Sequence, residues 1–124
     1  MAVTAAQRQH WQRRLAAEAA SVAERTAAAR QLAQASAQLL REHWPGLEAI
    51  WLFGSLQEGR FGLGSDVDLA VAGLPADALL SAMALLEPLQ RGEIAVDLVR
   101  FEDLDPHWQQ RLAERAELLC ARSR

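Results

Sequence analysis

LEAIWLFGSLQEGRFGLGSDVDLAVA, residues 47–72, is the stretch of sequence that decides the fold. Residues 47–53 are mainly apolar and lie between Pro45-Gly46 and Gly54, which predicts a buried strand. The glycines at positions 59, 62 and 64 predict a loop, which opens with one short helical turn at 55–57. Residues 67–72 predict a second strand, so the stretch is expected to fold as strand, loop and strand.

Gly54 and Ser55 follow the first strand directly, where the chain has to turn and backbone N–H groups are free to point at a ligand. Glycine lets a phosphate approach the backbone, and the serine hydroxyl adds a donor. A Gly-Ser pair taken alone is also typical of an ordinary turn, so its meaning depends on the residues that follow.

Asp66 and Asp68 lie two residues apart at the start of the second strand, so both carboxylates are expected on one face while Val67 and Leu69 take the other. Two adjacent like charges stay in water or are neutralised by a cation, and hard oxygen ligands suit Mg²⁺ or Mn²⁺. The alternatives are a solvated strand end and a Ca²⁺-binding turn.

Asp97 is the third candidate, because it interrupts a predicted strand at 94–99 and points away from the face shared by Ile94, Val96 and Leu98. If this strand lies beside the second one, Asp97 joins Asp66 and Asp68 around a pair of metal ions. The alternative is an acid that faces solvent on an edge strand.

Residues 4–43 contain no glycine or proline and predict a long helix, broken at most once. A seam of mostly small side chains runs along it at spacings of three and four: Leu15, Ala19, Val22, Thr26, Ala29, Ala33, Ser36 and Leu40. The seam either packs on the chain's own core or forms an arm that binds a partner or a second copy. Both interpretations stay open.

Further along, Pro75 and Asp77 introduce a predicted helix rich in leucine. Asp105-Pro106 is typical of a helix start, and the last helix is expected to run to about Cys120. Trp108, just inside this helix, is expected to be a core or interface anchor. The expected fold class is α+β, a small mixed sheet with flanking helices in one domain over 1–124, with a helical segment at 1–43 and a catalytic core at 47–120.

The composition limits the kinds of molecule and compartment that we expect for this chain. The 124 residues carry a formal net charge of −3, so no direct nucleic-acid binding is expected. Cys120 is the only cysteine, which excludes an internal disulfide and indicates a reducing compartment. No apolar run is long enough to span a membrane and no signal core is present, so we expect a cytoplasmic protein without membrane contact.

The pattern Gly54-Ser55, ten residues, then Asp66-Val67-Asp68 with Ser65 before the first acid resembles the signature of the DNA polymerase β-type nucleotidyltransferases, and most closely the minimal nucleotidyltransferases. The resemblance implies a polymerase β-like fold, ATP or another nucleoside triphosphate as substrate, and two Mg²⁺ ions held by Asp66, Asp68 and Asp97. It also implies that Gly54 and Ser55 hold the triphosphate, with Ser65 and Arg60 as further nucleotide-binding residues.

One departure stands at Leu56, where family members often carry an arginine, which leaves Arg60 as the only cation of the loop. Arg60 either compensates for the missing arginine or is simply solvated.

The resemblance further implies transfer of AMP to a hydroxyl of a partner, with the chain acting as antitoxin to a HEPN-type toxin. The alternatives are a catalytically degenerate binding module that neutralises its partner, and a nucleotidyltransferase for a small molecule of the aminoglycoside type.

Overall fold

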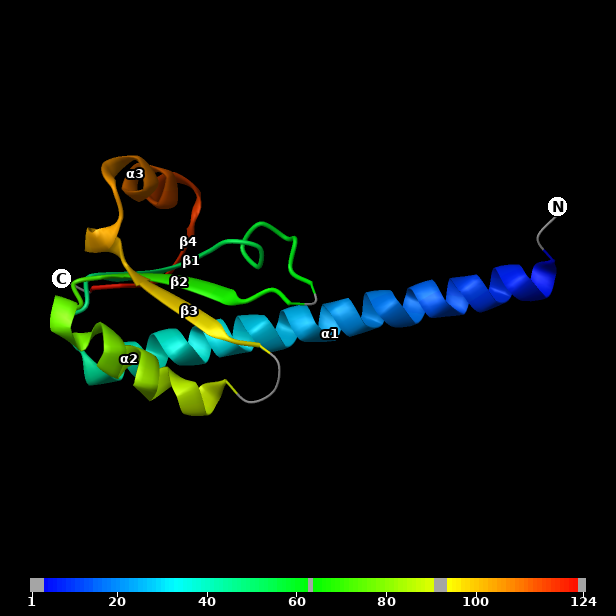
Figure 1. Ribbon diagram of the computed structural model, residues 1–124, viewed down its shortest axis with the longest axis horizontal. Helices are drawn as coiled ribbons and strands as arrows, with labels where there is room; N and C mark the ends of the chain where they lie inside the picture. The colour runs from blue at the N-terminus through cyan, green and yellow to red at the C-terminus, as the bar shows by residue number, and fades with distance from the viewer. Residues whose placement is uncertain (1–3, 63, 91–93, 123–124) are drawn as a thin grey trace.

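The computed structural model describes residues 4–62, 64–90 and 94–122. They form a mixed four-stranded sheet of order β3-β2-β1-β4 with helices on both faces, which confirms the predicted fold class (Figure 1). The helices and strands in chain order, with 3₁₀ helices written η, are α1 (Ala5–His43), β1 (Ala49–Phe53), β2 (Val67–Ala72), η1 (Ala76–Ala78), α2 (Leu79–Leu86), η2 (Glu87–Leu89), β3 (Val96–Arg100), η3 (Phe101–Asp103), α3 (Pro106–Arg115) and β4 (Glu117–Ala121). None of the helices in these ranges combines the length and apolar character that crossing a membrane requires.

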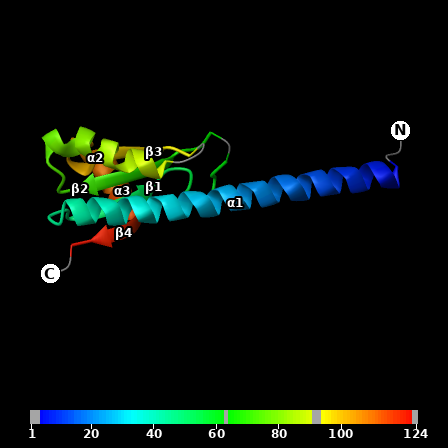
Figure 2. The same ribbon diagram turned by 90° about the horizontal axis from the view of Figure 1, so that it is seen from below.

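The sheet separates two layers of helix. The C-terminal half of α1 and all of α2 lie against one face, and α3 lies over the other (Figure 1 and Figure 2). β2 pairs with β1 in the antiparallel sense and with β3 in the parallel sense. In β2, Val67, Leu69 and Val71 are fully buried in the core, so Asp68 between them belongs to the face on the α3 side.

α1 is a single unbroken helix of 39 residues. Thr4 begins it with a capping box, in which the Thr4 hydroxyl accepts from the Gln7 N–H at 3.1 Å and the Gln7 side chain accepts from the Thr4 N–H at 2.9 Å. This pair satisfies two N–H groups at the helix start that have no partner within the helix.

The seam of α1 is divided between two environments. Its C-terminal members Ala29, Ala33, Ser36 and Leu40 are buried in the core. Every described residue from 4 to 24 is exposed, and this stretch, which we call the arm, extends beyond the sheet (Figure 2). The core interpretation is therefore confirmed for the C-terminal half of the seam, whereas none of the other described residues buries a residue of the arm.

The expectation of a helix reaching Cys120 is wrong. α3 ends at Arg115, and 117–121 form β4, which pairs with β1 in the antiparallel sense. Residue 116 adopts an extended backbone that stops the helix. The Arg30 guanidinium lies 3.3 Å from the Glu117 carboxylate, and Arg41 donates to the Cys120 sulfur at 3.1 Å, so two side chains of α1 tie β4 to the core layer.

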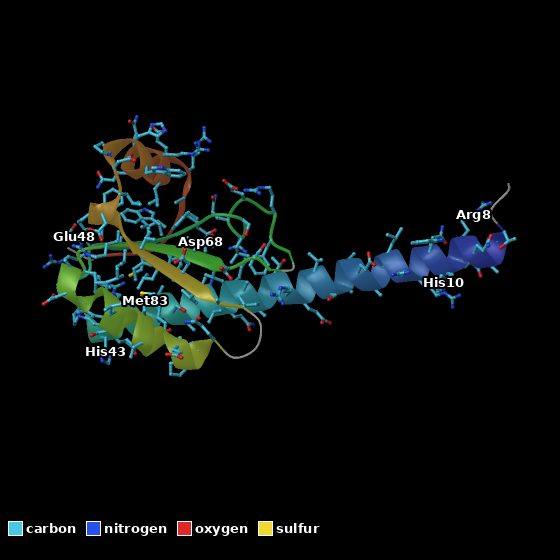
Figure 3. All side chains as sticks on the ribbon, in the orientation of Figure 1. Arg8, His10, His43, Glu48, Asp68 and Met83 are labelled. Atoms are coloured by element: carbon cyan, nitrogen blue, oxygen red, sulfur yellow. The ribbon has the colours of Figure 1, made fainter. Side chains whose placement is uncertain are left out.

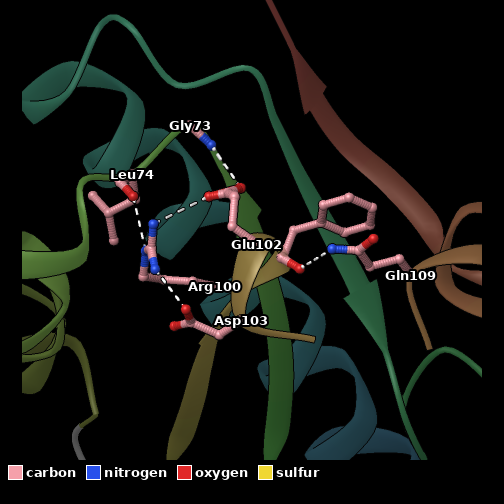
Figure 4. A network of polar contacts seen from close by, with 7 residues as sticks. Gly73, Leu74, Arg100, Glu102, Asp103 and Gln109 are labelled. Carbon is pink, nitrogen blue, oxygen red and sulfur yellow. Dashed lines mark hydrogen bonds and ion pairs between the residues drawn. The ribbon is translucent and has the colours of Figure 1, made fainter. Parts of the chain in front are cut away.

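The end of β3 is fixed by a polar network (Figure 4). Arg100 donates from Nε to the Leu74 carbonyl at 2.9 Å and from Nη1 to the Asp103 carboxylate at 2.6 Å. Gln109 of α3 donates to the Phe101 carbonyl at 2.9 Å. These contacts link the end of β3 both to the segment that follows β2 and to α3. They therefore help to set the position of α3 over the sheet.

Candidate active site

The turn after β1 brings Gly54 against the carboxylate of Asp68. Gly54 has φ +80°, which a side chain rarely allows. A Cβ on Gly54 would lie 2.1 Å from Asp68 Oδ2, so the position also has no room for one. The N–H of Glu58 donates to the Gly54 carbonyl at 3.0 Å, and the N–H of Arg60 donates to the Ser55 carbonyl at 2.8 Å. These hydrogen bonds close a short turn at the start of the loop that follows β1, where a turn was predicted.

The second and third acids lie side by side. Asp68 of β2 is in register with Asp97 of β3 and with Phe53 at the end of β1. Asp68 is half-buried, whereas Asp97 and Asp66 are exposed. Figure 3 labels Asp68 on β2, far from the outer end of α1. The structure therefore brings Gly54, Asp68 and Asp97 together, with Asp66 two residues before Asp68 on the same strand entrance.

The three carboxylates interact electrostatically. The pKa of Asp68 is raised to about 6, chiefly by burial and then by the negative charges of Asp97 and Asp66. Within the described ranges, no three histidine, cysteine, aspartate or glutamate side chains lie close enough together to form a ready metal site. The donor set nevertheless fits Mg²⁺, because a hard cation between carboxylates would relieve their mutual repulsion.

The glycine-rich loop is anchored by apolar side chains. Leu56, at the position where the family often has arginine, is only 2% exposed and belongs to the core, as does Phe61. The Arg25 guanidinium of α1 lies 6.0 Å from the centre of the Phe61 ring. Leu56 therefore holds the turn on the core and has no access to a phosphate.

The two other predicted nucleotide-binding residues have partners within the loop. Arg60 forms an ion pair and a hydrogen bond with Glu58, which lowers the pKa of Glu58. The Ser65 hydroxyl accepts from the Gly62 N–H at 3.1 Å, and the Ser65 N–H donates to the Gly62 carbonyl at the same distance. A role for Arg60 or Ser65 in nucleotide binding stays a prediction.

A pocket of about 260 Å³ adjoins the Gly54 turn and extends under α3. Its lining includes Gly54 and Arg60 from the turn, and Trp108, Arg111 and Arg115 from α3. A larger hollow of about 660 Å³ lies at the opposite end of β1 and β2. Neither pocket is lined by Asp66, Asp68 or Asp97, and only the smaller one includes Gly54.

The α3 residues of the smaller pocket were missed in the sequence. Trp108 was expected to be a core or interface anchor; the residue is 51% exposed, so it lies outside the core, and a role as an interface anchor stays a prediction. Trp108, Arg111 and Arg115 recur at spacings of three and four, which is a signal for one helix face. That signal does not show which part of the sheet the face approaches.

Comparisons with known proteins agree with this geometry. The family model described as "Polymerase beta, Nucleotidyltransferase" matches residues 34–124. A chain from the crystal structure of a toxin-antitoxin with AMP-PNP is 27% identical, with 71% of this chain and 73% of that chain covered and a TM-score of 0.59. A chain from a mutant of the toxin-antitoxin MntA-HpeT is 30% identical over 68% of each chain, with a TM-score of 0.53.

A third structure supports the fold alone, because its identity is 24%. It contains the tri-AMPylated HEPN toxin of Shewanella oneidensis in complex with its MNT antitoxin, and the match covers 74% of this chain and 71% of that chain with a TM-score of 0.55. A search of curated proteins gave no significant match.

Proposed function

Because the chain belongs to the polymerase β nucleotidyltransferase family, we propose that it transfers AMP from ATP to a hydroxyl group on a partner protein. One observation carries the proposal: the Gly54 turn, which can receive a phosphate, packs directly on Asp68, and Asp97 lies in register beside it. A phosphate-binding turn next to paired carboxylates is the arrangement that nucleotide transfer requires.

The candidate residues have two different roles, phosphate binding and metal binding. Gly54 and Ser55 offer a backbone and a hydroxyl to the triphosphate. Asp66, Asp68 and Asp97 would hold two Mg²⁺ ions, which when bound neutralise the charge on the phosphate oxygens.

The chemical step is an in-line displacement. The acceptor oxygen forms a bond to the α-phosphorus while the bond from that phosphorus to the bridging oxygen of the β-phosphate breaks, and pyrophosphate leaves with the electron pair. The exposed carboxylate of Asp97 accepts the proton of the acceptor hydroxyl. Asp97 lies beside the half-buried Asp68, at a point that an external hydroxyl can reach.

We further propose that the chain is the antitoxin of a HEPN-type toxin, which is its acceptor. The support is the similarity, at 27% and 30% identity, to chains from two toxin-antitoxin crystal structures, one of them with AMP-PNP. The chain contains no tyrosine, so it lacks a phenolic acceptor of its own. This composition favours transfer to a separate protein.

Intact-mass spectrometry tests the proposal. The chain is incubated with ATP and Mg²⁺, alone and with the protein encoded by the neighbouring gene, and Asp68→Asn serves as the control. A mass gain of one AMP or more on the neighbour, absent with the variant, is expected. A gain on this chain alone would refute transfer to a partner, and no gain on either would refute transfer to a protein.

A binding module without catalysis is the second candidate. Two observations favour it: the carboxylates form no ready metal site within the described residues, and Trp11 on the uncovered arm is 55% exposed. If this candidate is correct, Asp68→Asn neutralises the partner as well as wild type does. A third possibility, transfer to a small molecule, predicts turnover of ATP without any change in the mass of either protein.

A further inference from the structure

The α3 side of the pocket beside the Gly54 turn carries two arginines, and we infer that Arg111 and Arg115 bind the β- and γ-phosphates of the nucleotide. The inference rests on the proposed function for the kind of ligand, a nucleoside triphosphate. It assigns to α3 the positive charge that the Gly-Ser turn itself does not supply.

One face of α3 is directed at the pocket. Trp108, Arg111, Leu112 and Arg115 all line it, at the spacing of neighbours on a helix surface. Leu112 is 5% exposed and packs this face down, whereas both arginines are exposed. The guanidinium groups therefore stand at the rim of the pocket, where a ligand that rests on Gly54 can reach them.

Among the arginines around the Gly54 turn, those on α3 are the ones that form no ion pair with a described carboxylate. A triphosphate is strongly anionic, and Asp68, which lies against Gly54, adds negative charge. Of the three arginines that line the pocket, Arg60 is paired with Glu58. Neither Arg111 nor Arg115 has a carboxylate within ion-pair distance in the part of the chain that the structure describes. Planar guanidinium groups bind phosphate oxygens through two parallel hydrogen bonds.

Trp108 and Glu58 support this assignment. The Arg111 guanidinium lies 5.6 Å from the centre of the Trp108 ring, a cation–π contact between two residues that line the pocket. Glu58 lies in the same pocket, and its pKa is lowered chiefly by Arg60 and then also by Arg111 and Arg115. The field of both α3 arginines thus reaches an anionic group beside Gly54 before any ligand is present.

The test compares three ligands and three variants by titration calorimetry at one ionic strength. The ligands are ATP with Mg²⁺, AMP with Mg²⁺, and inorganic tripolyphosphate with Mg²⁺. The variants are Arg111→Gln, Arg115→Gln and the matched control Arg122→Gln, which makes the same charge change beyond β4. Arg122 lies at the opposite end of β1 from Gly54, because its N–H donates to the Glu48 carbonyl at 2.9 Å. Thermal melts check that every variant is folded.

Each α3 variant is expected to weaken binding of ATP and tripolyphosphate by about tenfold or more, since each removes a charge-assisted contact to a phosphate. AMP has no β- or γ-phosphate, so its affinity should stay within about twofold, a change well below one such contact. The control should match wild type for all ligands.

The inference is overturned if either α3 variant binds ATP as wild type does, or if AMP loses affinity in parallel with ATP. A different result would refute the proposed function and leave the inference standing. In that result the wild type binds tripolyphosphate but not ATP, and the α3 variants lose binding of tripolyphosphate. If the wild type binds neither ATP nor tripolyphosphate, both proposals are refuted.

Discussion

Replacing Gly54 with alanine should reduce stability more than the same change at Gly59. Both glycines have positive φ, +80° and +77°, so alanine pays a left-handed backbone cost of about 1 kcal/mol at each position. A Cβ at Gly59 meets nothing within 4 Å, whereas at Gly54 it meets Asp68 Oδ2 at 2.1 Å. Forcing the Asp68 side chain out of its rotamer adds about 1 kcal/mol, so Gly54→Ala should cost about 2 kcal/mol in total.

Urea unfolding of the single and double variants measures this extra cost. In the Asp68→Ala background the nearest remaining atom of residue 68 is Cβ, at 3.3 Å, so most of the clash is removed. The double-mutant cycle between Gly54→Ala and Asp68→Ala should therefore give a coupling of about 1 kcal/mol. The cycle between Gly59→Ala and Asp68→Ala should give none.

Calorimetry with Mg²⁺ and ATP adds a functional readout. Gly54→Ala displaces the Asp68 carboxylate and is expected to abolish binding, whereas Gly59→Ala should retain it. Equal free energies of unfolding for the two glycine variants, together with a coupling near zero, would show that the carboxylate does not lie against Gly54, and the site geometry described above would be wrong.

Four further predictions concern charge, metal, packing and the arm. The pKa of Asp68 is raised from 3.8 to about 6 by burial, then Asp97 and Asp66, so the folded state binds this proton more tightly than the unfolded state does and stability falls as pH rises from about 4 to about 6. Asp68→Asn should remove about 1 kcal/mol of that fall, a value reduced for solvent screening, and identical pH profiles of Tm would contradict it. ATP should bind in Mg²⁺ and not in EDTA, because the carboxylates repel a triphosphate; equal affinities in calorimetry would exclude the metal site. Leu56→Arg should cost about 3 kcal/mol or more in urea unfolding, since it buries a charge at a position 2% exposed, while Leu56→Met stays within about 1.5 kcal/mol; an arginine tolerated there would place Leu56 at the surface. Deleting 1–24 should leave Tm nearly unchanged, because every described residue of that stretch is exposed, and should weaken association with a second chain in light scattering; a large drop in Tm with unchanged association would assign the arm to the core.

Local patterns in the sequence predicted the strands that carry two of the candidate acids, Asp68 and Asp97. β2 spans 67–72 as expected, and at its start Asp66 and Asp68 alternate with Val67 and Leu69 with the period of a strand. The same alternation placed Asp97 on the face opposite Leu98, which is buried while Asp97 is exposed. What alternation could not give was the register of Asp97 with Asp68, since that depends on how β3 pairs.

Non-local contacts account for the features that the sequence left out. The five residues of β4 contain a short apolar run that suits a helix end equally well, and only pairing with β1 makes it a strand. The approach of Arg111 and Arg115 to Gly54 likewise depends on where α3 rests on the sheet. No spacing rule connects these arginines with the Gly-Ser pair.

The helical arm fixes the distance between Trp11 and the glycine-rich loop. With a rise of about 1.5 Å per residue, the helix places Trp11 about 21 Å from Arg25, the residue that contacts the glycine-rich loop. A flexible tether would merely raise the local concentration of whatever it held, whereas a continuous helix fixes a separation. A molecule that contacts both Trp11 and the loop would have to span at least that distance.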